Sequence, residues 1–306
     1  MGHKKLQPLL IIFLLLVSSL AGNPGYAEIL MEKRSLYSNV QVRSSGSLVC
    51  LLFAVKQDQR NQSCINTRSP KAMVFAYTKM TMAALLFNPD PQRILVVGLG
   101  GGTLPTAFAE LLPEVEIDTL EIDPVVITVA EEYFNYQTSE RQRVHPQDAR
   151  IWVKRAVLNE EKFDLIILDA FNGDYIPEHL MTREFFQELD SLLTADGVLV
   201  ANTFSISRLY DYESATFADV FGPFINFQLP ESANRVVMAP KAEVSDDLLK
   251  ARAKEWQDRL RRYAVPIRRF AASLIRQRKE EPDWDTSVRV LTDQYSPANI
   301  LNEQAR

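Results

Sequence analysis

Asp169 stands out among the residues that are equipped to do chemistry in this sequence. It directly follows Phe163–Leu168 (FDLIIL), an unbroken apolar run that is typical of a strand buried on both faces. An ionised side chain at the tip of such a strand is costly unless a partner or a ligand uses it. Asp174 and Tyr175 follow in a loop that also contains a glycine and a proline. We expect this loop to close over a substrate. Because an amine is protonated near neutral pH, two neighbouring carboxylates suit its recognition and deprotonation. We therefore expect Asp169 to be the catalytic base, and Asp174 and Tyr175 to contact an amine substrate.

A second cluster follows the apolar run Ile94–Val97, where four glycines come almost in succession. Glycines after a buried strand allow a sharp turn and bring backbone N–H groups close to a ligand. A dinucleotide fingerprint needs glycine at its sixth position, and Thr103 stands there. The loop therefore favours a cofactor without a pyrophosphate, such as an adenosyl sulfonium, over a dinucleotide. A tight turn with a purely structural role is the alternative. The glycines expected to bind the cofactor are Gly98, Gly100, Gly101 and Gly102.

Acids also follow the next two predicted strands. Glu121 ends one of them, where a carboxylate can accept hydrogen bonds from both ribose hydroxyls. Asp123 comes two residues later, at the start of the next predicted helix. Asp148 and Ala149 follow another strand and are placed to bind an adenine amino group, although Asp148 fits a helix N-cap nearly as well. We expect all four residues to contact the cofactor.

These residues belong to an alternating series of strands and helices. Strand-like runs alternate with helical runs of about ten residues, which predicts a doubly wound, mainly parallel α/β sheet. Such sheets place their ligands at the carboxyl ends of the strands, where the acids and glycines gather. We divide the chain into a signal peptide (1–27), an N-terminal β-hairpin region (28–72), a Rossmann-like cofactor-binding domain (73–245) and an Arg-rich helical extension interrupted at Pro266 (246–306).

Composition narrows the class of partner. The 306 residues carry a net charge of −5, which gives no reason to expect a nucleic-acid partner. Cys50 and Cys64 lie in the two arms of the predicted hairpin, so they either form a disulfide in an exported protein or remain free thiols in the cytosol. Neither has a His or a second Cys at metal-ligand spacing, and we expect no metal.

The N-terminus has the layout of a secretory signal peptide. Lys4 and Lys5 precede the apolar run Leu9–Leu20, and small residues lead to a cleavage site after Ala27. The run is shorter than the roughly 20 residues of a membrane span, so we expect export to the periplasm or medium rather than a stable span. The alternative is a start at Met31 and a cytoplasmic protein.

Seven stretches in their order resemble the spermidine synthase (polyamine aminopropyltransferase) family. They are Leu36-Tyr37, the helix with Tyr77, VVGLGGG, LEID, DARIWV, DLIILDAFNGDYIPEHLMTREFF and LTDQYSPANIL, and they extend from Leu36 to Leu301. The resemblance implies a small N-terminal β domain before a class I methyltransferase-like Rossmann domain, and commonly a homodimer. It also implies that Glu121, Asp148 and Ala149 hold the adenosyl part of decarboxylated S-adenosylmethionine. Asp169 then deprotonates the amine, and Tyr77 belongs to the substrate side.

The chain also departs from the family pattern at four positions. Thr103 replaces the Asp that usually follows the last glycine, and Asn172 replaces a second acid near the catalytic Asp. Thr78 stands for the usual His after Tyr, and Ser38 for the usual Gln. The longer loop DAFNGD (Asp169–Asp174) resembles a divergent, spermidine-synthase-like branch. The loss of acids at positions 103 and 172 removes negative charge that would hold cationic ligands. Two alternatives follow: a class I methyltransferase that uses S-adenosylmethionine, and a non-catalytic protein that binds an adenosyl ligand.

Overall fold

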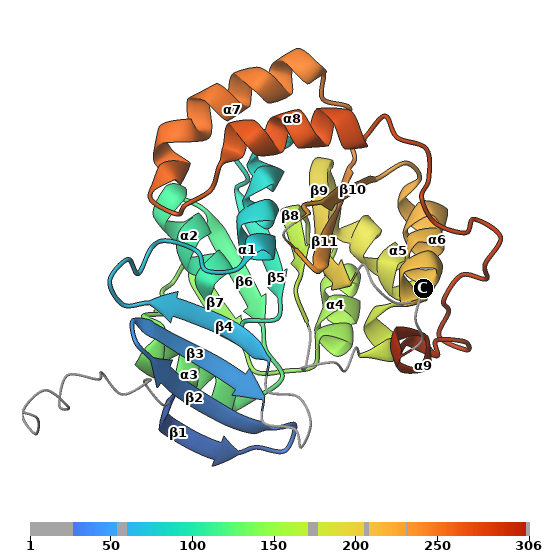
Figure 1. Ribbon diagram of the computed structural model, residues 1–306. Helices are drawn as coiled ribbons and strands as arrows, with labels where there is room; N and C mark the ends of the chain where they lie inside the picture. Colours follow the sequence, from blue (N-terminus) through green and yellow to red (C-terminus); the bar gives the residue numbers. More distant parts are fainter. Residues whose placement is uncertain (1–26, 54–59, 171–176, 205–207, 231, 304–306) are drawn as a thin grey trace, which may run out of the picture.

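A small antiparallel sheet forms the N-terminal part of the protein (Figure 1). The computed structural model describes residues 27–53, 60–170, 177–204, 208–230 and 232–303. The four strands pair in sequence order, so the predicted hairpin, which is β3 and β4, forms one end of a larger sheet. Cys50 and Cys64 lie directly opposite each other on β3 and β4 and form a disulfide. The strands are β1 (Glu28–Arg34), β2 (Asn39–Ser45), β3 (Leu48–Phe53) and β4 (Asn61–Asn66).

The central sheet has seven strands in the order β10-β11-β9-β8-β5-β6-β7. Among these strands, β11 alone runs opposite to the other six, so the predicted doubly wound and mainly parallel sheet is confirmed. The carboxyl ends of β5, β6, β8 and β9 therefore meet at one edge. The strands are β5 (Arg93–Val97), β6 (Glu116–Leu120), β7 (Gln142–His145), β8 (Phe163–Leu168), β9 (Leu193–Phe204), β10 (Ile225–Gln228) and β11 (Asn234–Pro240).

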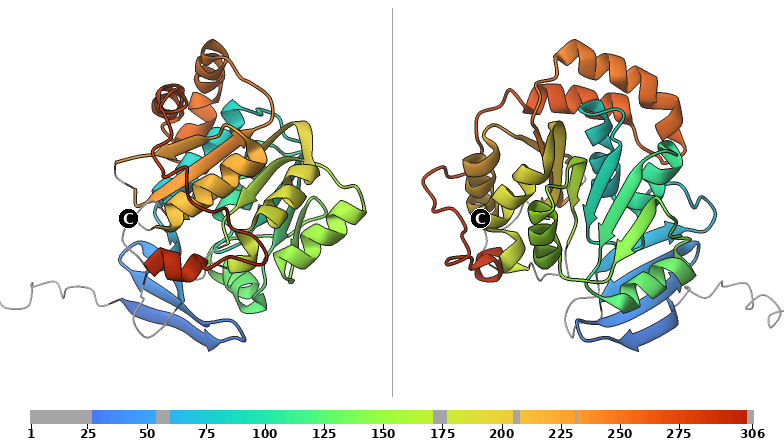
Figure 2. Two further views of the ribbon diagram at one scale, coloured as in Figure 1. Left: turned by 90° about the vertical axis from the view of Figure 1, so that its right-hand side faces the viewer. Right: turned by 180° about the vertical axis from the view of Figure 1, so that it is seen from behind.

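Helices cover both faces of this sheet (Figure 2). Successive residues of β5 point to opposite faces: Ile94 and Val96 join one core cluster, and Leu95 and Val97 join the other. The first cluster packs against α1, η1, α2, α7 and α8, and the second against α4, α5 and α6. The helices are α1 (Ala76–Thr81), the 3₁₀ helix η1 (Met82–Leu86), α2 (Thr103–Leu111), α3 (Pro124–Tyr133), α4 (Ala149–Leu158), the 3₁₀ helix η2 (Glu178–Leu180), α5 (Arg183–Leu192), α6 (Leu209–Phe221), α7 (Asp246–Arg261), α8 (Ile267–Gln277) and α9 (Ala298–Glu303).

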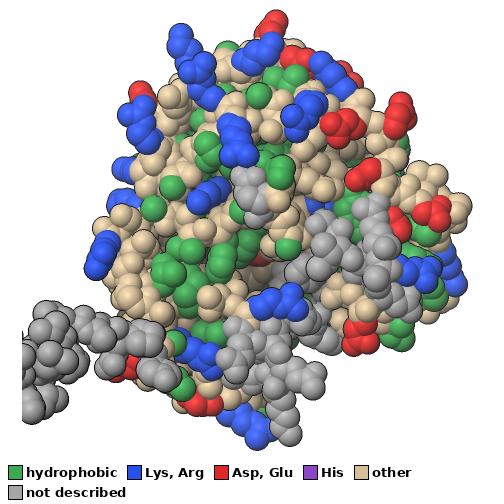
Figure 3. All heavy atoms as spheres, in the orientation of Figure 1, with side chains coloured by type: hydrophobic (Ala, Val, Ile, Leu, Met, Phe, Trp, Pro, Cys, Tyr) green, Lys and Arg blue, Asp and Glu red, His purple; other side chains and the backbone are tan. Residues whose placement is uncertain are grey.

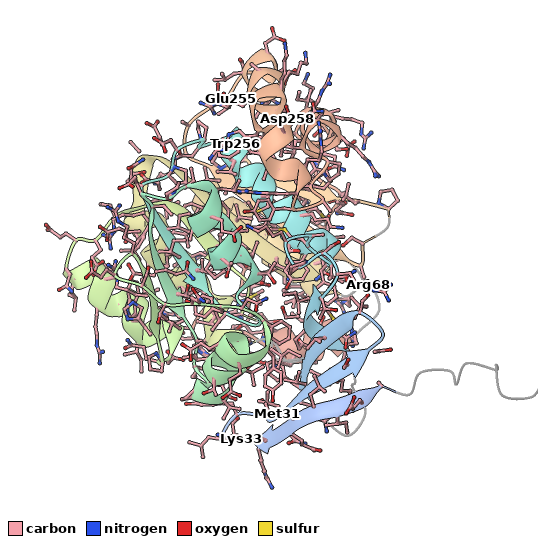
Figure 4. All side chains as sticks on the ribbon, turned by 90° about the vertical axis from the view of Figure 1, so that its left-hand side faces the viewer. Met31, Lys33, Arg68, Glu255, Trp256 and Asp258 are labelled. Carbon is pink, nitrogen blue, oxygen red and sulfur yellow. A yellow bond between two sulfur atoms is a disulfide. The ribbon has the colours of Figure 1, made fainter. Side chains whose placement is uncertain are left out.

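The C-terminal helices complete the sheet domain. Pro266 separates α7 from α8, as the sequence predicts, and both helices bury apolar side chains in the first core cluster. Trp256 is 2% exposed, whereas its neighbours Glu255 and Asp258 on α7 are exposed (Figure 4). Over these helices, Lys and Arg side chains gather with acidic ones among them (Figure 3). The Arg-rich stretch is thus the solvated face of two amphipathic helices.

The short N-terminal sheet is joined to the central domain by packing. Val40, Val42 and Leu51 of this sheet share a core cluster with Val126 and Val129 of α3. The carboxyl-end edge of the central sheet therefore faces a second wall, which the N-terminal sheet supplies. No helix in the described part of the chain is both long and apolar enough to cross a membrane.

Candidate active site

A cavity of about 600 Å³ lies at the carboxyl ends of the central strands, with the N-terminal sheet as its second wall. Its volume is in the range of small-molecule sites. It brings together residues that are far apart in the sequence, including nearly all the predicted site residues that the structure describes. From the predicted set, its lining contains Tyr77, Gly98, Gly100, Glu121, Asp123, Asp148, Ala149 and Asp169.

Asp169 lies at the end of β8 with its carboxylate in the cavity wall. Asn202, at the end of the neighbouring strand β9, donates a hydrogen bond from Nδ2 to Asp169 Oδ1 at 2.8 Å. Tyr77 of α1 donates a second hydrogen bond to the same carboxylate. Burial raises the pKa of Asp169 from 3.8 to about 7, and the two hydrogen bonds counteract part of this rise. A carboxylate with a pKa near neutrality is suited to accept a proton.

Tyr77 is the partner of Asp169 on the α1 side. Burial, followed by the nearby charge of Asp169 and the hydrogen bond between them, raises the pKa of the Tyr77 hydroxyl well above 10. The phenol therefore stays protonated and acts as a hydrogen-bond donor near neutral pH.

Gly98 allows the backbone of the glycine loop to approach Asp169 closely. It has φ +98°, and a Cβ built on it would lie 2.2 Å from the carbonyl oxygen of Asp169. Any side chain there would push the loop and β8 apart. The first glycine of the loop thus fixes the spacing between the cofactor loop and the predicted base.

Glu121 holds the same loop from the end of β6. Its carboxylate accepts hydrogen bonds from the backbone N–H groups of Leu99 at 3.2 Å and of Asp123 at 3.0 Å. Burial raises the pKa of Glu121, and these backbone hydrogen bonds oppose the rise. The carboxylate lines the cavity where the sequence places a ribose, and it also orders the glycine loop.

Gly101 and Gly102 have a packing role in the structure. Neither belongs to the residues that line the cavity. A Cβ on Gly101 would lie 2.8 Å from the ring of Phe134, and a Cβ on Gly102 would lie 2.5 Å from the ring of Tyr136. These two glycines let the start of α2 pack against the segment that follows α3.

Asp123 links the loop to the N-terminal sheet. It is 3% exposed, and its Oδ1 accepts a hydrogen bond from Val125 N at 2.9 Å as the N-cap of α3. Its Oδ2 accepts a hydrogen bond from the hydroxyl of Ser35, in the turn between β1 and β2. Both carboxylate oxygens are therefore used by protein groups, which support the cavity wall.

Asp148 has the predicted role of a helix N-cap and also lines the cavity. It is the N-cap of α4, where Oδ1 accepts a hydrogen bond from Ile151 N at 3.0 Å. Its Oδ2 lies 3.1 Å from Nε2 of His179, which also lines the cavity. Ala149, the first residue of α4, stands beside it in the lining. Both residues therefore border the cavity, and binding of an adenine edge stays a prediction.

The positions at which the chain departs from the family pattern also lie here. Thr103 is the first residue of α2. It lines the cavity together with Thr78 and Ser38. Thr78 is buried and donates its hydroxyl to the carbonyl oxygen of Phe75 at 2.9 Å. The neutral side chains therefore stand at the cavity itself. Asp174 and Tyr175, together with Asn172, lie outside the described residues.

Two residues of the site were not predicted from the sequence. Asn202 follows the apolar part of β9, and the strand-end rule that selects Asp169 would also have selected it. Asn234 begins β11 and donates from Nδ2 to Asn202 Oδ1 at 3.0 Å. No local sequence motif indicates Asn234, because its contact with Asn202 depends on the antiparallel pairing of β11 with β9. Within the described residues, no three His, Cys, Asp or Glu side chains are arranged to hold a metal ion.

Comparisons with known proteins agree with this architecture. The family model of the spermine/spermidine synthase domain matches residues 74–228. The polyamine aminopropyltransferase of Vibrio vulnificus is 47% identical over 300 residues, covering 97% of this chain and 99% of the relative. The crystal structure of a probable spermidine synthase from Corynebacterium glutamicum is similar with a TM-score of 0.63 at 21% identity, covering 86% of this chain and 99% of that chain. Human methyltransferase-like protein 13, crystallised in complex with SAH, gives a TM-score of 0.53 at 24% identity over 70% of this chain and 97% of that chain.

The fold and the cavity together define a class: a Rossmann-like domain of the kind shared by methyltransferases and spermidine synthases, with acids and glycines at its strand ends. The identity over almost the whole chain then selects between the branches of that class. The chain belongs to the spermine/spermidine synthase family.

Proposed function

We propose that this protein transfers an aminopropyl group from decarboxylated S-adenosylmethionine to an amine such as putrescine. The observation that carries the proposal is Asp169, a carboxylate in the cavity wall with a pKa of about 7 and two hydrogen-bond donors that orient it. The Vibrio vulnificus relative, which aligns over nearly the full length of this chain, is named for this activity.

In this mechanism the acceptor amine enters next to Asp169, which takes a proton from the nitrogen. The free electron pair of the nitrogen attacks the aminopropyl carbon bound to the sulfonium. A carbon–nitrogen bond forms, the carbon–sulfur bond breaks, and its electrons neutralise the sulfonium, so that methylthioadenosine leaves as a thioether. Tyr77 and Asn202 keep the carboxylate aimed during this step.

The rest of the cavity accounts for the adenosyl part of the donor. Glu121 stands beside the glycine loop, where it can accept from ribose hydroxyls, and Asp148 and Ala149 are placed for an adenine edge. Thr103 offers a hydroxyl where an acid would meet the aminopropyl amine. We expect the lost charge to weaken donor binding without removing the base.

We also propose that the protein is exported. Support comes from the signal-peptide layout and from the disulfide between Cys50 and Cys64, because disulfides persist mainly in oxidising compartments. Met31 lies inside β1 (Figure 4), so a start there would remove the first three residues of that strand. Mass spectrometry of the native N-terminus tests this: a chain that begins at Glu28 supports export, and one that begins at Met31 refutes it.

Titration calorimetry with the two sulfonium compounds, followed by turnover with putrescine, tests the proposed activity. We expect tighter binding of decarboxylated S-adenosylmethionine than of S-adenosylmethionine, and product formation that is lost in Asp169→Asn. Methyl transfer from S-adenosylmethionine would replace the proposal by the methyltransferase alternative. Binding of neither compound would refute both enzymatic functions.

A further inference from the structure

A chain of two amides ends on the carboxylate of Asp169. Asn234 donates from Nδ2 to Asn202 Oδ1 at 3.0 Å, and Asn202 donates from Nδ2 to Asp169 Oδ1 at 2.8 Å. An amide has a donor end and an acceptor end, whereas a carboxylate only accepts. The direction of the chain is therefore fixed at its Asp169 end, and Asn234 supplies the donor that the other end of Asn202 requires.

The strand register makes this contact possible. Asn234 pairs with Phe204 in the antiparallel ladder of β11 and β9, so Asn202 is its diagonal neighbour on the same face. Arg235 pairs with Thr203, and their side chains point to the opposite face. Asn234 is also held locally, because its backbone N–H donates to the Ser232 hydroxyl at 3.1 Å.

A buried ion pair on the opposite face of the sheet stabilises the ends of β9 and β11. Arg235 is fully buried and donates to Glu213 Oε2 at 2.8 Å, to the Ser214 hydroxyl at 2.6 Å and to Asn226 Oδ1 at 2.9 Å. Thr203 also donates its hydroxyl to Glu213. These contacts hold β9 and β11 in register, so Asn234 stays within hydrogen-bond distance of Asn202.

We propose that Asn234 is a positioning residue, which holds the Asn202 amide with its N–H toward Asp169 and so keeps the predicted base oriented and ionised. The proposal rests on the proposed function of Asp169. Without the donor at 234, Asn202 is free to turn its oxygen toward the carboxylate. That oxygen repels the ionised form and favours the protonated one.

Charged and titratable groups that line the same cavity also interact electrostatically with Asp169. Tyr77, on α1, is in direct contact with it and stays neutral. The other titratable groups of the lining come from the turn between β1 and β2, from the β4 side, from the segment after β6, from the start of α4 and from η2: Tyr37, Arg60, Glu121, Asp123, Asp148 and His179. A neutral substitution at 234 leaves these charges in place, so a change in the Asp169 pKa in that variant reports on the amide chain.

The test measures the pKa of Asp169 directly, by carbon NMR of labelled aspartate carboxyls with Asp169→Asn as the assignment control. In Asn234→Asp, the new carboxylate accepts from the Asn202 amide and turns its oxygen to Asp169, which raises the pKa by about one unit. Asn234→Ala raises it less. Asn61→Asp places the same charge in the opposite wall of the cavity, on β4, and is the matched control for charge alone.

A second measurement separates positioning from general damage to the fold. In an Asn202→Ala background, Asn234→Ala should leave the Asp169 pKa unchanged, because the linking amide is gone. An unchanged pKa in Asn234→Asp, or a shift no larger than in Asn61→Asp, overturns the proposal. If the pKa shifts as expected but the wild-type protein transfers no aminopropyl group, the positioning role survives and the proposed function fails.

In the active enzyme the same variants should move the acidic limb of the kcat/KM profile. For Asn234→Asp we expect the limb to move up by about one pH unit, with a loss of about tenfold at pH 6 and little loss at pH 9. A uniform loss at every pH would indicate a structural role and would contradict the proposal.

Discussion

Asp169→Asn should slow transfer strongly and at the same time stabilise the protein at alkaline pH. The folded protein raises the pKa of Asp169 from 3.8 to about 7. Between these values the folded chain holds a proton that the unfolded chain has released, so the free energy of unfolding falls as the pH rises through this window. At pH 8 the full cost is present, and below pH 4 it vanishes. An amide at 169 never ionises and escapes this cost.

The size of the effect follows from the same values. The difference between 3.8 and about 7 corresponds to about 4 kcal/mol, at about 1.4 kcal/mol per pKa unit. Because the Asp169 side chain keeps part of its surface open to the cavity, we take about half of this, roughly 2 kcal/mol. For a chain of this size such a gain raises Tm by about 4 °C. Loss of the general base should reduce kcat by about 10²- to 10⁴-fold.

Thermal unfolding of the wild-type and Asp169→Asn proteins at a series of pH values measures the first effect, and release of methylthioadenosine measures the second. We expect the gain in Tm to be largest at pH 8 and to shrink steadily toward pH 5. A variant that is less stable than the wild type at pH 8, or a gain that does not depend on pH, would refute the assigned burial of the carboxylate. Turnover within about threefold of the wild type would refute its role as base.

Three further changes have defined outcomes. Gly98→Ala should lower Tm and weaken donor binding in calorimetry, because its Cβ would lie 2.2 Å from the backbone oxygen of Asp169. Replacing Cys50 and Cys64 by Ser opens a cross-link between residues 14 apart, and the urea midpoint should fall by the equivalent of about 3 kcal/mol. Tyr77→Phe removes a donor to Asp169, so the acidic limb of kcat/KM should move up by about one pH unit.

Each of these has a control or a contradicting result. Gly46 also has a positive φ of +60°, but a Cβ there meets nothing within 4 Å, so Gly46→Ala measures backbone strain alone. Equal losses in the two glycine variants would contradict the close approach at Gly98. An unchanged urea midpoint without the cysteines would contradict a stabilising disulfide. A loss of activity in Tyr77→Phe that is the same at every pH would contradict the hydrogen bond to the base.

Much of the central sheet is predictable because its strands are buried on both faces. Phe163–Leu168 is strand β8 with the predicted bounds, and the glycine loop after β5 leads into helix α2 as the predicted alternation of strands and helices requires. Strand β1 was not predicted, because almost all of its residues are exposed and its sequence lacks an apolar alternation. The mainly apolar stretch Met73–Phe87 contains the short α1 followed by the 3₁₀ turn η1 and not one long helix.

The candidate site divides in the same way. Asp169, Glu121 and Asp148 were predictable because each comes directly after or shortly after a strand of the parallel sheet, where the carboxyl ends converge. Asn234 was not, since it begins the antiparallel strand β11, and a single sequence does not give the register of that pairing. Gly101 is read locally as a ligand-binding glycine, but its contact with Phe134 depends on the tertiary packing.

The central claim is that this cavity moves an aminopropyl group and that Asp169 accepts the proton. Mass spectrometry of a reaction with decarboxylated S-adenosylmethionine and putrescine tests it most directly, with S-adenosylmethionine in a parallel reaction. We predict that the first reaction yields methylthioadenosine and aminopropylated amine in equal amounts, and that Asp169→Asn forms both at least about 100-fold more slowly. Methylated amine together with S-adenosylhomocysteine in the parallel reaction, and no methylthioadenosine in the first, would contradict it.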